Sequence, residues 1–548
     1  MPRPALAASA LFAFAALFPA RAEDAALPHL KRQGTATQLI VDGKPFILLA
    51  GELHNSSATG PAYLESLWPR LKALNLNAVI GTASWELIEP EEGTFDFTLV
   101  DGLIRQARAA GIRLVLIWFG SWKNGVSSYC PGWVLRDTKR FPRCLGSSNR
   151  NTKDILTPLS EENRKADARA FAALMRHLRE FDGRDRTVVL VQVENEVGIK
   201  PEPRDLSPRG DEMYNGPVPA ELMAYLQQHK DALLPELRGH WEKAGLKTSG
   251  SWAEVFGKGF PSEEIFMAWH YAAYINAVAK AGKAEYPLPM YVNAWLRAPD
   301  WKPGHYPVGG PLAHVMDVWK AAAPEIALLA PDIYLPDFKG ICAEYTQQGN
   351  PLFIPEARTD PDAAARAFWA IAEHGAIGFA PFGIDHVDPE KHPLDEAYAV
   401  LGQLLPAIAA AQGTNRLRGI YQQDPGQEAP EKPVELDGWR ANVRYMKRRP
   451  SKDAAYGLVL QTGAEEFLVA GWGIEVNFSA TVPGPRRNTG LLSVELGRIE
   501  RGAWVTEMRL NGDETGANHV AKIPPNTDNT FLDPLRPRIL RVRTYRYD

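Results

Sequence analysis

The feature that most constrains the fold is a regular alternation of short apolar runs and longer amphipathic stretches between about residues 45 and 412. The strand-like runs are Phe46–Gly51, Asn77–Thr82, Arg113–Gly120, Thr187–Glu194, Leu288–Trp295, Leu328–Tyr334, Leu352–Glu356 and Ala376–Phe382. Helix-compatible segments follow them, for example Tyr63–Leu74, Leu99–Ala110, Glu162–Glu180, Ala363–His374 and Leu394–Gln412. Runs that are apolar throughout are typical of strands buried on both faces. About eight such β-then-α units predict an α/β fold, a (β/α)8 TIM barrel, rather than a meander.

One connection in this region is far longer than a plain loop. Residues 199–262 form an insertion rich in Pro, Gly and charged residues, and it contains Tyr214, Trp241 and Trp252. Insertions of this size on a barrel usually form lids or walls of a site, so we expect that role here. The alternative is an insertion with a purely structural role.

The composition changes after Gln412. Between Ser451 and Asp548, short alternating runs are separated by Gly, Pro and Asn, and this pattern predicts an antiparallel β-sandwich. We expect residues 415–450 to connect the two domains and to pack on the barrel. The predicted organisation is a barrel domain over 23–414, followed by the connecting segment and the β-sandwich domain over 415–548.

Residues 1–22 have the features of a secretory signal peptide. Arg3 precedes the apolar run Ala5–Leu17, and Ala20-Arg21-Ala22 resembles a small-x-small cleavage site before Glu23. The run is shorter than the ~20 residues that a membrane span needs. We therefore predict an exported protein, periplasmic or secreted, that does not cross a membrane.

The chain has three cysteines. Cys130 and Cys144 flank a short polar loop, and an oxidising compartment favours a disulfide between them that would leave Cys342 free. The alternative is three free thiols, because sequence spacing does not show the Cα geometry that a disulfide requires.

Charge and motifs exclude several classes of function. The 61 Lys and Arg against 65 Asp and Glu give a formal net charge of −4, which provides no basic field for nucleic acid. The sequence has no Walker loop, dinucleotide fingerprint, Gly-x-Ser-x-Gly elbow or His-Glu-x-x-His helix, so we predict no cofactor and no metal. The acidic and histidine residues of 385–395 are interpreted as a polar loop, with His386 near the rim of a site. The oligomeric state stays open, with a homodimer as one option.

Two strand ends carry carboxylates. The apolar run Val188–Val193 leads directly into Glu194-Asn195-Glu196, and a second apolar run leads into Pro355-Glu356. Barrel enzymes hold their active sites at the C-terminal ends of the strands. Alternatively, Glu356 could cap the next helix or pair with Arg358. Two carboxylates that face each other across a barrel mouth are the minimum equipment for glycoside hydrolysis, with retention at a separation of ~5–5.5 Å and inversion at a wider one.

The segment Gln192-Val193-Glu194-Asn195-Glu196-Val197-Gly198 resembles the acid/base motif of glycoside hydrolase family 35, whose members are mostly β-galactosidases. Trp85–Gly93 and Ala50–His54 resemble two further motifs of that family, although Ser84, Glu86 and Val197 replace its usual residues. The resemblance covers about residues 30–410. The segment Trp118–Gly125 is more similar to family 42 β-galactosidases, so the chain resembles a divergent bacterial branch.

The resemblance implies roles for particular residues. Glu196 would protonate the leaving oxygen and later activate water, while Glu356 would form the glycosyl-enzyme bond. We expect the negative charge of Glu356 to raise the pKa of Glu196. Asn195 would hydrogen-bond the sugar 2-hydroxyl, and Tyr334 would hold the carboxylate of the nucleophile.

Further candidates for contacts with a sugar lie near strand ends. Aromatic rings cover the flat faces of sugars, and the chain has 15 Trp and 17 Tyr residues. The rings expected to stack on sugar are Trp85, Trp122, Trp295 and Phe382. The polar residues expected to contact sugar hydroxyls are Glu52, His54, Glu86, Asn124 and Asn293.

The sequence thus predicts an exo-acting retaining β-galactosidase that releases terminal β-galactose from plant-derived oligosaccharides, with xyloglucan as one source. Two alternatives stay open. An endo-β-glycanase of the same clan, such as a mannanase or cellulase, would share both glutamates but need an open cleft. A non-catalytic carbohydrate-binding protein could also have kept the barrel.

Overall fold

Eight parallel strands form a closed barrel in the computed structural model, which describes residues 26–147, 152–446, 454–482, 486, 488–525 and 537–548. Around the barrel the strands follow the order β4 (Leu48–Glu52), β5 (Ala78–Ser84), β6 (Arg113–Lys123), β9 (Val188–Asn195), β10 (Met290–Trp295), β11 (Leu328–Ile333), β12 (Glu356–Ala357) and β13 (Gly378–Phe379). The parallel pairing of β13 with β4 and the bridge between Ile354 and Phe379 close the ring.

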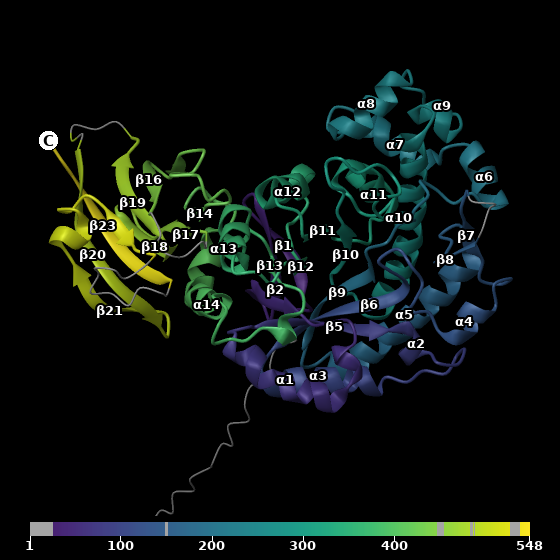
Figure 1. Cartoon of the computed structure of the whole chain (residues 1–548), viewed down its shortest axis with the longest axis horizontal. Coiled ribbons are helices and arrows are strands. Elements are labelled where there is room, and N and C mark those ends of the chain that lie inside the picture. The colour runs from purple at the N-terminus through teal and green to yellow at the C-terminus, as the bar shows by residue number, and fades with distance from the viewer. Residues whose placement is uncertain (1–25, 148–151, 447–453, 483–485, 487, 526–536) are drawn as a thin grey trace, which may run out of the picture.

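Within the described chain, every barrel strand leads to a helix on the outside of the barrel (Figure 1). In chain order these are α1 (Pro61–Ala73), α3 (Thr98–Ala110), α5 (Glu161–Asp182), α10 (Phe260–Glu285), α11 (Met316–Ala322), α12 (Phe338–Tyr345), α13 (Ala363–Glu373) and α14 (Leu394–Ala411). In α5, the Ser160 side chain caps the first turn, and Ala166, Ala170 and Leu174 recur on the buried face. This arrangement confirms the predicted (β/α)8 barrel. Among the described residues, no helix combines the length and apolarity that crossing a membrane requires.

A small antiparallel sheet closes the N-terminal end of the barrel, and the sequence reasoning missed it. It consists of β1 (His29–Gln33), β2 (Ala36–Val41) and β3 (Lys44–Pro45). Leu39 and Val41 pack in one apolar cluster with the inner side chains of the barrel strands. Asp42 and Gly43 both have positive φ between paired strands, as an Asp-Gly hairpin turn requires, so that dipeptide was the available signal.

The insertion after β9 folds into a helical lobe at the upper right of Figure 1. In the described residues the lobe contains α6 (Pro208–Asn215), α7 (Ala220–Gln228), α8 (Pro235–Lys243) and α9 (Trp252–Phe256). Trp241 and Trp252 are buried, so they form the core of the lobe. Shorter excursions carry α2 (Trp85–Ile88), α4 (Gly132–Arg136), and the pair β7 (Arg143–Leu145) and β8 (Thr152–Leu156).

The C-terminal region is an antiparallel β-sandwich, as predicted. In the described residues one sheet has the order β14 (Leu417–Tyr421), β17 (Tyr456–Gln461), β18 (Glu466–Trp472), β23 (Arg538–Tyr547), β20 (Asn488–Glu500) and β21 (Ala503–Leu510). The other has the order β15 (Val434–Leu436), β16 (Trp439–Tyr445), β19 (Ile474–Ala480) and β22 (Ala521–Ile523). Residues of both sheets, such as Val469 and Phe478, share one apolar core. Residues 415–450 do more than connect the domains, because β14, β15 and β16 belong to these sheets.

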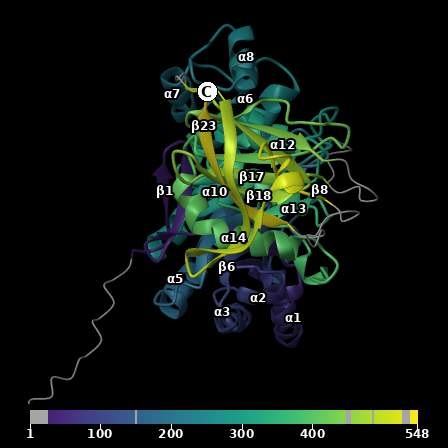
Figure 2. The same cartoon turned by 90° about the vertical axis from the view of Figure 1, so that its left-hand side faces the viewer.

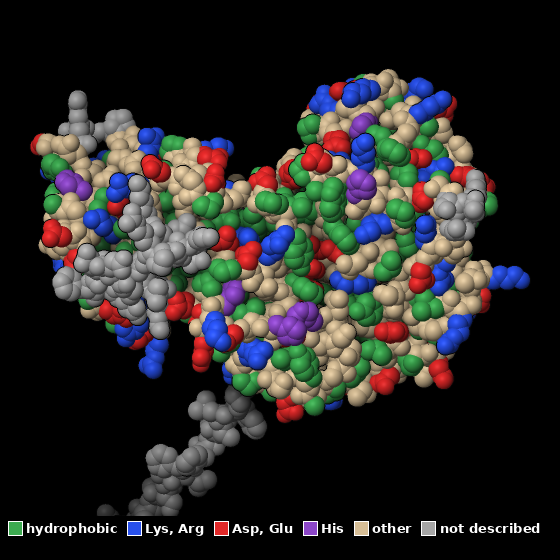
Figure 3. Space-filling view, in the orientation of Figure 1, with side chains coloured by type: hydrophobic (Ala, Val, Ile, Leu, Met, Phe, Trp, Pro, Cys, Tyr) green, Lys and Arg blue, Asp and Glu red, His purple; other side chains and the backbone are tan. Residues whose placement is uncertain are grey.

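The sandwich packs on the barrel through α13 and α14, and Figure 2 looks onto it with the barrel behind. Glu373 of α13 pairs with Arg418 and accepts a 3.0 Å hydrogen bond from the Gly419 amide. The rings of Phe368 and Tyr456 lie 5.0 Å apart across the same junction. The space-filling view shows a notch in the outline between the sandwich and the helical lobe (Figure 3).

The expected disulfide between Cys130 and Cys144 is absent from the described residues, where both thiols and that of Cys342 are free and buried. The Cys130 thiol contacts the carbonyl oxygens of Gly120 and Ser121 on β6. The Cys144 thiol instead faces the Leu156 carbonyl of the paired strand β8. Each cysteine thus fills its own place in the core, and burial raises the pKa of all three thiols.

We therefore expect three free thiols in the purified protein. After unfolding in denaturant without reductant, alkylation should add three labels to the intact mass, because no sulfur is held in a bridge. Without denaturant, labelling should be slow, since all three sulfurs are buried. An intact mass with one label and two fewer hydrogens would instead show that two of the cysteines form a disulfide.

Candidate active site

Buried carboxylates converge at the C-terminal end of the barrel strands. Glu196 follows β9, Asp332 lies in β11 and Glu356 begins β12. All three are buried, and one oxygen of each lies within 4.8 Å of one oxygen of the others. Glu52 ends β4 and is also buried at this mouth, where the charges of Glu196 and Glu356 act on it. The strand-end pattern thus does bring Glu196 and Glu356 together.

The backbone at the end of β9 is strained, and the side chains of Glu194 and Glu196 turn to different surroundings. Glu194 and Glu196 both have positive φ, at 65° and 46°, a region that non-glycine residues seldom adopt. The Glu194 carboxylate accepts hydrogen bonds from the amides of Ser121 and Trp122, at 3.1 and 2.7 Å. Glu194 is therefore structural, while Glu196 belongs to the carboxylate cluster.

Tyr334 and Asn293 position the carboxylates. The Tyr334 hydroxyl donates a 2.5 Å hydrogen bond to Oε1 of Glu356, the contact proposed from the sequence. The Asn293 side chain accepts from the Glu196 amide at 3.0 Å and donates to Asp332 at 2.7 Å. Asn293 therefore helps to hold the site together, and its contact with a sugar stays a prediction.

Asn195 is the polar side chain most clearly available to a ligand. It is buried, and neither its Oδ1 nor its Nδ2 has a hydrogen-bond partner among the described residues. An unpaired buried amide is costly, so a hydrogen bond from this amide to a ligand or to water would be favourable. Oε2 of Glu356 and Oδ1 of Asp332 are also unpaired in the described structure.

Burial is the main electrostatic influence on this cluster. It raises the pKa of Glu196 to about 7, with the negative charge of Glu356 as the second cause and Lys123 opposing both. Burial and then the charge of Glu356 also raise the pKa values of Glu52 and Asp332 well above their ordinary range. The predicted direction for Glu196 is confirmed, but burial contributes more than the neighbouring charge.

Lys123 and Asp332 are parts of the site that the sequence reasoning missed. The positive charge of Lys123, a buried residue at the end of β6, lowers the pKa values of Glu52 and Glu196. A polar residue at the end of an apolar run was the available signal for both. Lys123 directly precedes the candidate Asn124, and Asp332 stands two residues before Tyr334.

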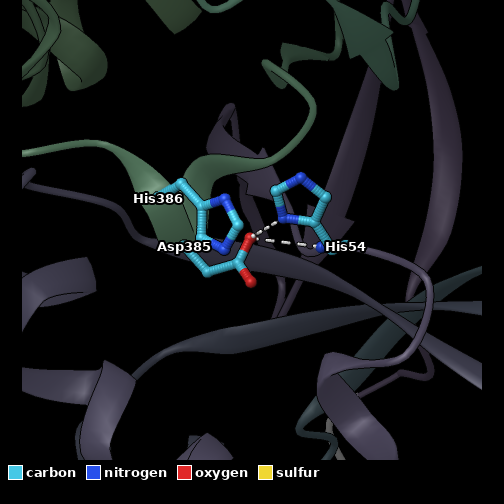
Figure 4. Close-up of side chains that lie close together, drawn as sticks. All are labelled: His54, Asp385 and His386. Carbon is cyan, nitrogen blue, oxygen red and sulfur yellow. Dashed lines mark hydrogen bonds and ion pairs between the residues drawn. The ribbon is translucent and has the colours of Figure 1, made fainter.

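His54 lies at the rim, where Asp385 fixes its orientation (Figure 4). Oδ1 of Asp385 accepts from the His54 amide at 3.2 Å and from Nδ1 of its ring at 2.8 Å, and Oδ2 accepts from Ser57 at 2.7 Å. The His54 ring lies 4.2 Å from that of His386 and 5.1 Å from that of Phe382. Asp385 thus leaves Nε2 of His54 available for another contact.

Two groups of side chains have the ligand types and spacing that could hold a metal ion in the described part of the chain. One is His54, Asp385 and His386, but both Asp385 oxygens already accept hydrogen bonds that an ion would have to displace. The other is the cluster of Glu196, Asp332 and Glu356. There Tyr334 and Asn293 already donate to two of the carboxylates.

The structure contradicts the predicted sugar-stacking role of two residues. Trp85 and Trp122 are fully buried, with their indole groups donating to Glu89 at 2.8 Å and to the Leu156 carbonyl at 3.0 Å. A ring with no exposed face cannot stack on a sugar, so both are core residues.

The remaining candidates lie around the mouth. Trp295 is partly exposed, and the Lys200 ammonium lies 3.7 Å from the centre of its ring. Phe382 forms a backbone bridge with Glu52. Asn124 has positive φ and an Oδ1 without a partner in the described structure. Glu86 is partly exposed, and burial raises its pKa.

Comparison with known proteins relates parts of this chain to glycoside hydrolases. A family model described as β-galactosidase, of glycoside hydrolase family 42, matches residues 63–234, and a domain of unknown function, DUF5597, matches residues 394–521. A β-galactosidase from Xanthomonas manihotis is 31% identical over 210 residues, which are 36% of this chain and 31% of that protein. The chain therefore aligns with less than a third of that relative. The expected similarity to β-galactosidases of the glycoside hydrolases is confirmed.

Solved structures show similarity at low sequence identity. A β-galactosidase from Bacillus circulans sp. alkalophilus has a TM-score of 0.44 and 15% identity, covering 65% of this chain and 56% of that one. The catalytic domain of a β-amylase from Paenibacillus polymyxa has a TM-score of 0.43 and 12% identity, covering 63% and 94%.

The raised pKa of Glu196 makes a prediction about stability. A carboxyl group with a higher pKa in the folded state binds more protons there than when unfolded. Stability should therefore fall as pH rises from 4.5 to about 7. Glu196→Gln removes this titration, so its stability relative to the parent should increase over that window, by up to about 3 kcal/mol at ~1.36 kcal/mol per pH unit. Chemical denaturation at pH 4.5 and pH 8 measures the change.

Glu221→Gln is the matched control, because Glu221 is exposed on α7 and the substitution is the same. It should leave the difference between the two pH values unchanged. If Glu196→Gln gives the same relative stability at pH 4.5 and pH 8, the pKa of Glu196 is not raised by the fold.

Proposed function

We propose that this protein is an exo-acting retaining β-galactosidase that works by double displacement. The observation that carries the proposal is the pairing of Glu196 and Glu356, with oxygens within 4.8 Å of each other in a buried barrel mouth. Retaining enzymes need carboxyl groups only ~5–5.5 Å apart, whereas inverting enzymes leave ~6.5–9.5 Å for a water molecule. The short spacing therefore favours retention.

In the first step, a Glu356 oxygen attacks the anomeric carbon while Glu196 gives its proton to the departing glycosidic oxygen. A pKa of about 7 keeps Glu196 largely protonated in mildly acidic solution and leaves a substantial protonated fraction at neutral pH, as a general acid requires. Tyr334 fixes the attacking carboxylate through its hydrogen bond to Oε1 and leaves Oε2 unpaired.

In the second step, Glu196 takes a proton from water, which attacks the same carbon and releases Glu356. The glycosyl bond removes the charge of Glu356, which is the second cause of the raised pKa of Glu196. The pKa of Glu196 should therefore fall once the intermediate forms, and the same residue becomes a base. The unpaired amide of Asn195 suits the sugar 2-hydroxyl, a contact that strengthens in the transition state.

Three observations support galactose and exo-action. The matched family model and the Xanthomonas relative are both described as β-galactosidases. The helical lobe follows the acid/base strand in the sequence, where it can restrict access to the mouth. A buried polar group such as Glu52, whose Oε1 has no partner in the described structure, can tell the axial 4-hydroxyl of galactose from an equatorial one, because a lost contact leaves a buried group unpaired.

The natural substrate that we propose is a plant-derived oligosaccharide with terminal β-galactose, with xyloglucan fragments as one source. The motifs around Glu196, Trp85 and His54 favour family 35 for the barrel, and the apolar N-terminal run favours export to the periplasm. That run lies outside the described residues.

Replacing Glu356 tests its proposed role as the nucleophile. Glu356→Ala should lower kcat on an aryl β-galactoside by on the order of 10³-fold or more, because no carboxylate remains to attack. Added azide should partly restore turnover and give the α-galactosyl azide, the inverted product. Spectrophotometric rates and NMR of the azide product measure both effects.

Glu196→Ala provides the contrasting variant. With azide it should give the β-galactosyl azide, and it should lose more activity on alkyl galactosides than on activated aryl galactosides, because only poor leaving groups need the acid. Wild-type rates in Glu356→Ala, or the same azide anomer from both variants, would contradict the assigned roles.

Product analysis over time should show exo-action. On a galactosylated xyloglucan oligosaccharide, we expect galactose as the sole early product, since a mouth with restricted access admits a chain terminus. Linear β-glucan and mannan should stay intact, as chromatography will report. Early mid-chain fragments would instead support an endo-β-glycanase, and tight binding without any product would support a non-catalytic barrel.

A further inference from the structure

A cavity of about 250 Å³ lies between the helical lobe and the loops that follow β10. Its walls come from α8, from the first turn of α10, from the loop after β10 and from the 3-10 helix Ala313–Val315. Pockets for drug-sized ligands measure ~300–1,000 Å³, so this one suits a smaller group. None of the catalytic candidates described above lines it.

Two buried atoms of residues that line this cavity, Oε1 of Glu264 and Nε2 of His314, have no hydrogen-bond partner in the described structure. Glu264 lines the cavity and is only 4% exposed. Its Oε2 accepts from the Tyr306 hydroxyl at 2.9 Å and pairs with Nε2 of His314 at 3.0 Å, but its Oε1 is buried and unpaired. A buried carboxylate oxygen without a donor is costly, and a ligand hydroxyl would satisfy it.

The charges of the cavity disfavour an anion. The guanidinium of Arg297 is engaged in a two-pronged pair with Glu236, at 3.1 and 3.0 Å. Its charge is therefore already balanced, and Glu264 adds a negative charge beside His314. A neutral ligand with hydroxyl donors fits this balance better than a phosphate or a carboxylate.

The rest of the lining is apolar and suits the C–H face of a sugar. Leu237, Ile265 and Val315 form part of the wall. Phe260, in the first turn of α10, is 51% exposed, although large apolar side chains are usually buried. An exposed ring beside a lone buried acceptor is the combination that binds a pyranose, with stacking on one side and a hydroxyl contact on the other.

A chain of contacts connects this cavity to the acid/base end of the active site. The positive charge of Lys200 lowers the pKa of Glu196, and the Lys200 ammonium lies 3.7 Å from the centre of the Trp295 ring. Trp295 ends β10, and Arg297, two residues later, lines the cavity. The side of the mouth that holds the acid/base receives the leaving group, so the cavity lies toward the departing part of the substrate.

We propose that this cavity is a distal subsite that binds one neutral sugar unit of the leaving-group portion of an oligosaccharide. Phe260 stacks on that unit and Oε1 of Glu264 accepts one of its hydroxyl protons. This inference rests on the proposed glycosidase function, because only a leaving group that extends from Glu196 toward Trp295 would reach it.

The test compares a short and a long substrate in Phe260→Ala. With linear β-1,4-galactotetraose, kcat/KM should fall about tenfold, the scale of one lost contact. With 4-nitrophenyl β-galactoside, whose leaving group is a single ring, kcat/KM should stay within about twofold. Glu264→Gln keeps an oxygen acceptor for Tyr306 and should show the same selective loss. Tyr63→Ala is the matched control, because Tyr63 is an aromatic residue on α1 that is 46% exposed.

Calorimetric titration separates this inference from the proposed function. Galactotetraose should bind Glu356→Gln about tenfold more tightly than it binds Glu356→Gln/Phe260→Ala, whereas methyl β-galactoside should bind both alike. Equal loss on both substrates, or unchanged tetraose binding and turnover in folded Phe260→Ala and Glu264→Gln proteins, would overturn the subsite. Absence of β-galactoside hydrolysis by the wild type would overturn the proposed function, whatever the titrations show.

Discussion

The interaction on which the site depends is the mutual repulsion of carboxylates that the barrel holds out of water. Glu52, Glu196, Asp332 and Glu356 are all buried at one mouth, with Lys123 as a buried positive charge beside them. One lysine cannot balance that many anions in a low dielectric, so protons stay on some of them near neutral pH. A protonated carboxyl group and a carboxylate can therefore exist side by side, as the proposed mechanism requires. The fold has to supply the free energy that keeps this cluster together.

The surrounding contacts supply that free energy by fixing geometry. Asn293 links the backbone of β9 to Asp332 on β11, and Tyr334 holds Glu356 at the start of β12. These residues lie on or directly after four neighbouring strands of one closed sheet, β9 to β12, so their relative positions are set by barrel hydrogen bonds. The rigid outer helices and the small N-terminal sheet then stabilise the barrel without contributing to the chemistry. This division matches the usual one, in which the N-terminal face serves stability and the C-terminal face function.

The sequence allowed the barrel, the sandwich and the meeting of Glu196 with Glu356 to be predicted, because apolar runs mark strands and parallel strands end at one mouth. It did not show which way a strand-end side chain turns. Trp85 and Trp122 stand where a sugar-stacking ring would stand, but both pack inward. Lys123 and Asp332 were missed because one polar residue after an apolar run is common. The small sheet at residues 29–45 and the strands between 417 and 445 were missed, although β16 alternates buried and exposed residues as a strand with one face on a core does.

The orientation of the Glu196 side chain depends on local contacts of this kind. In a regular strand, residues 194 and 196 would point to the same side. Here Glu194 turns instead to the amides that follow Gly120 on β6, and positive φ at Glu194 breaks the alternation. A side chain at Gly120 would lie 2.5 Å from Oε1 of Glu194 and 2.3 Å from the Trp118 indole nitrogen, so glycine is needed there. The strained turn that carries Glu196 is thus held by the neighbouring strand β6. Glu194, which takes no part in the proposed reaction, makes the contacts, and Gly120 leaves the space for them.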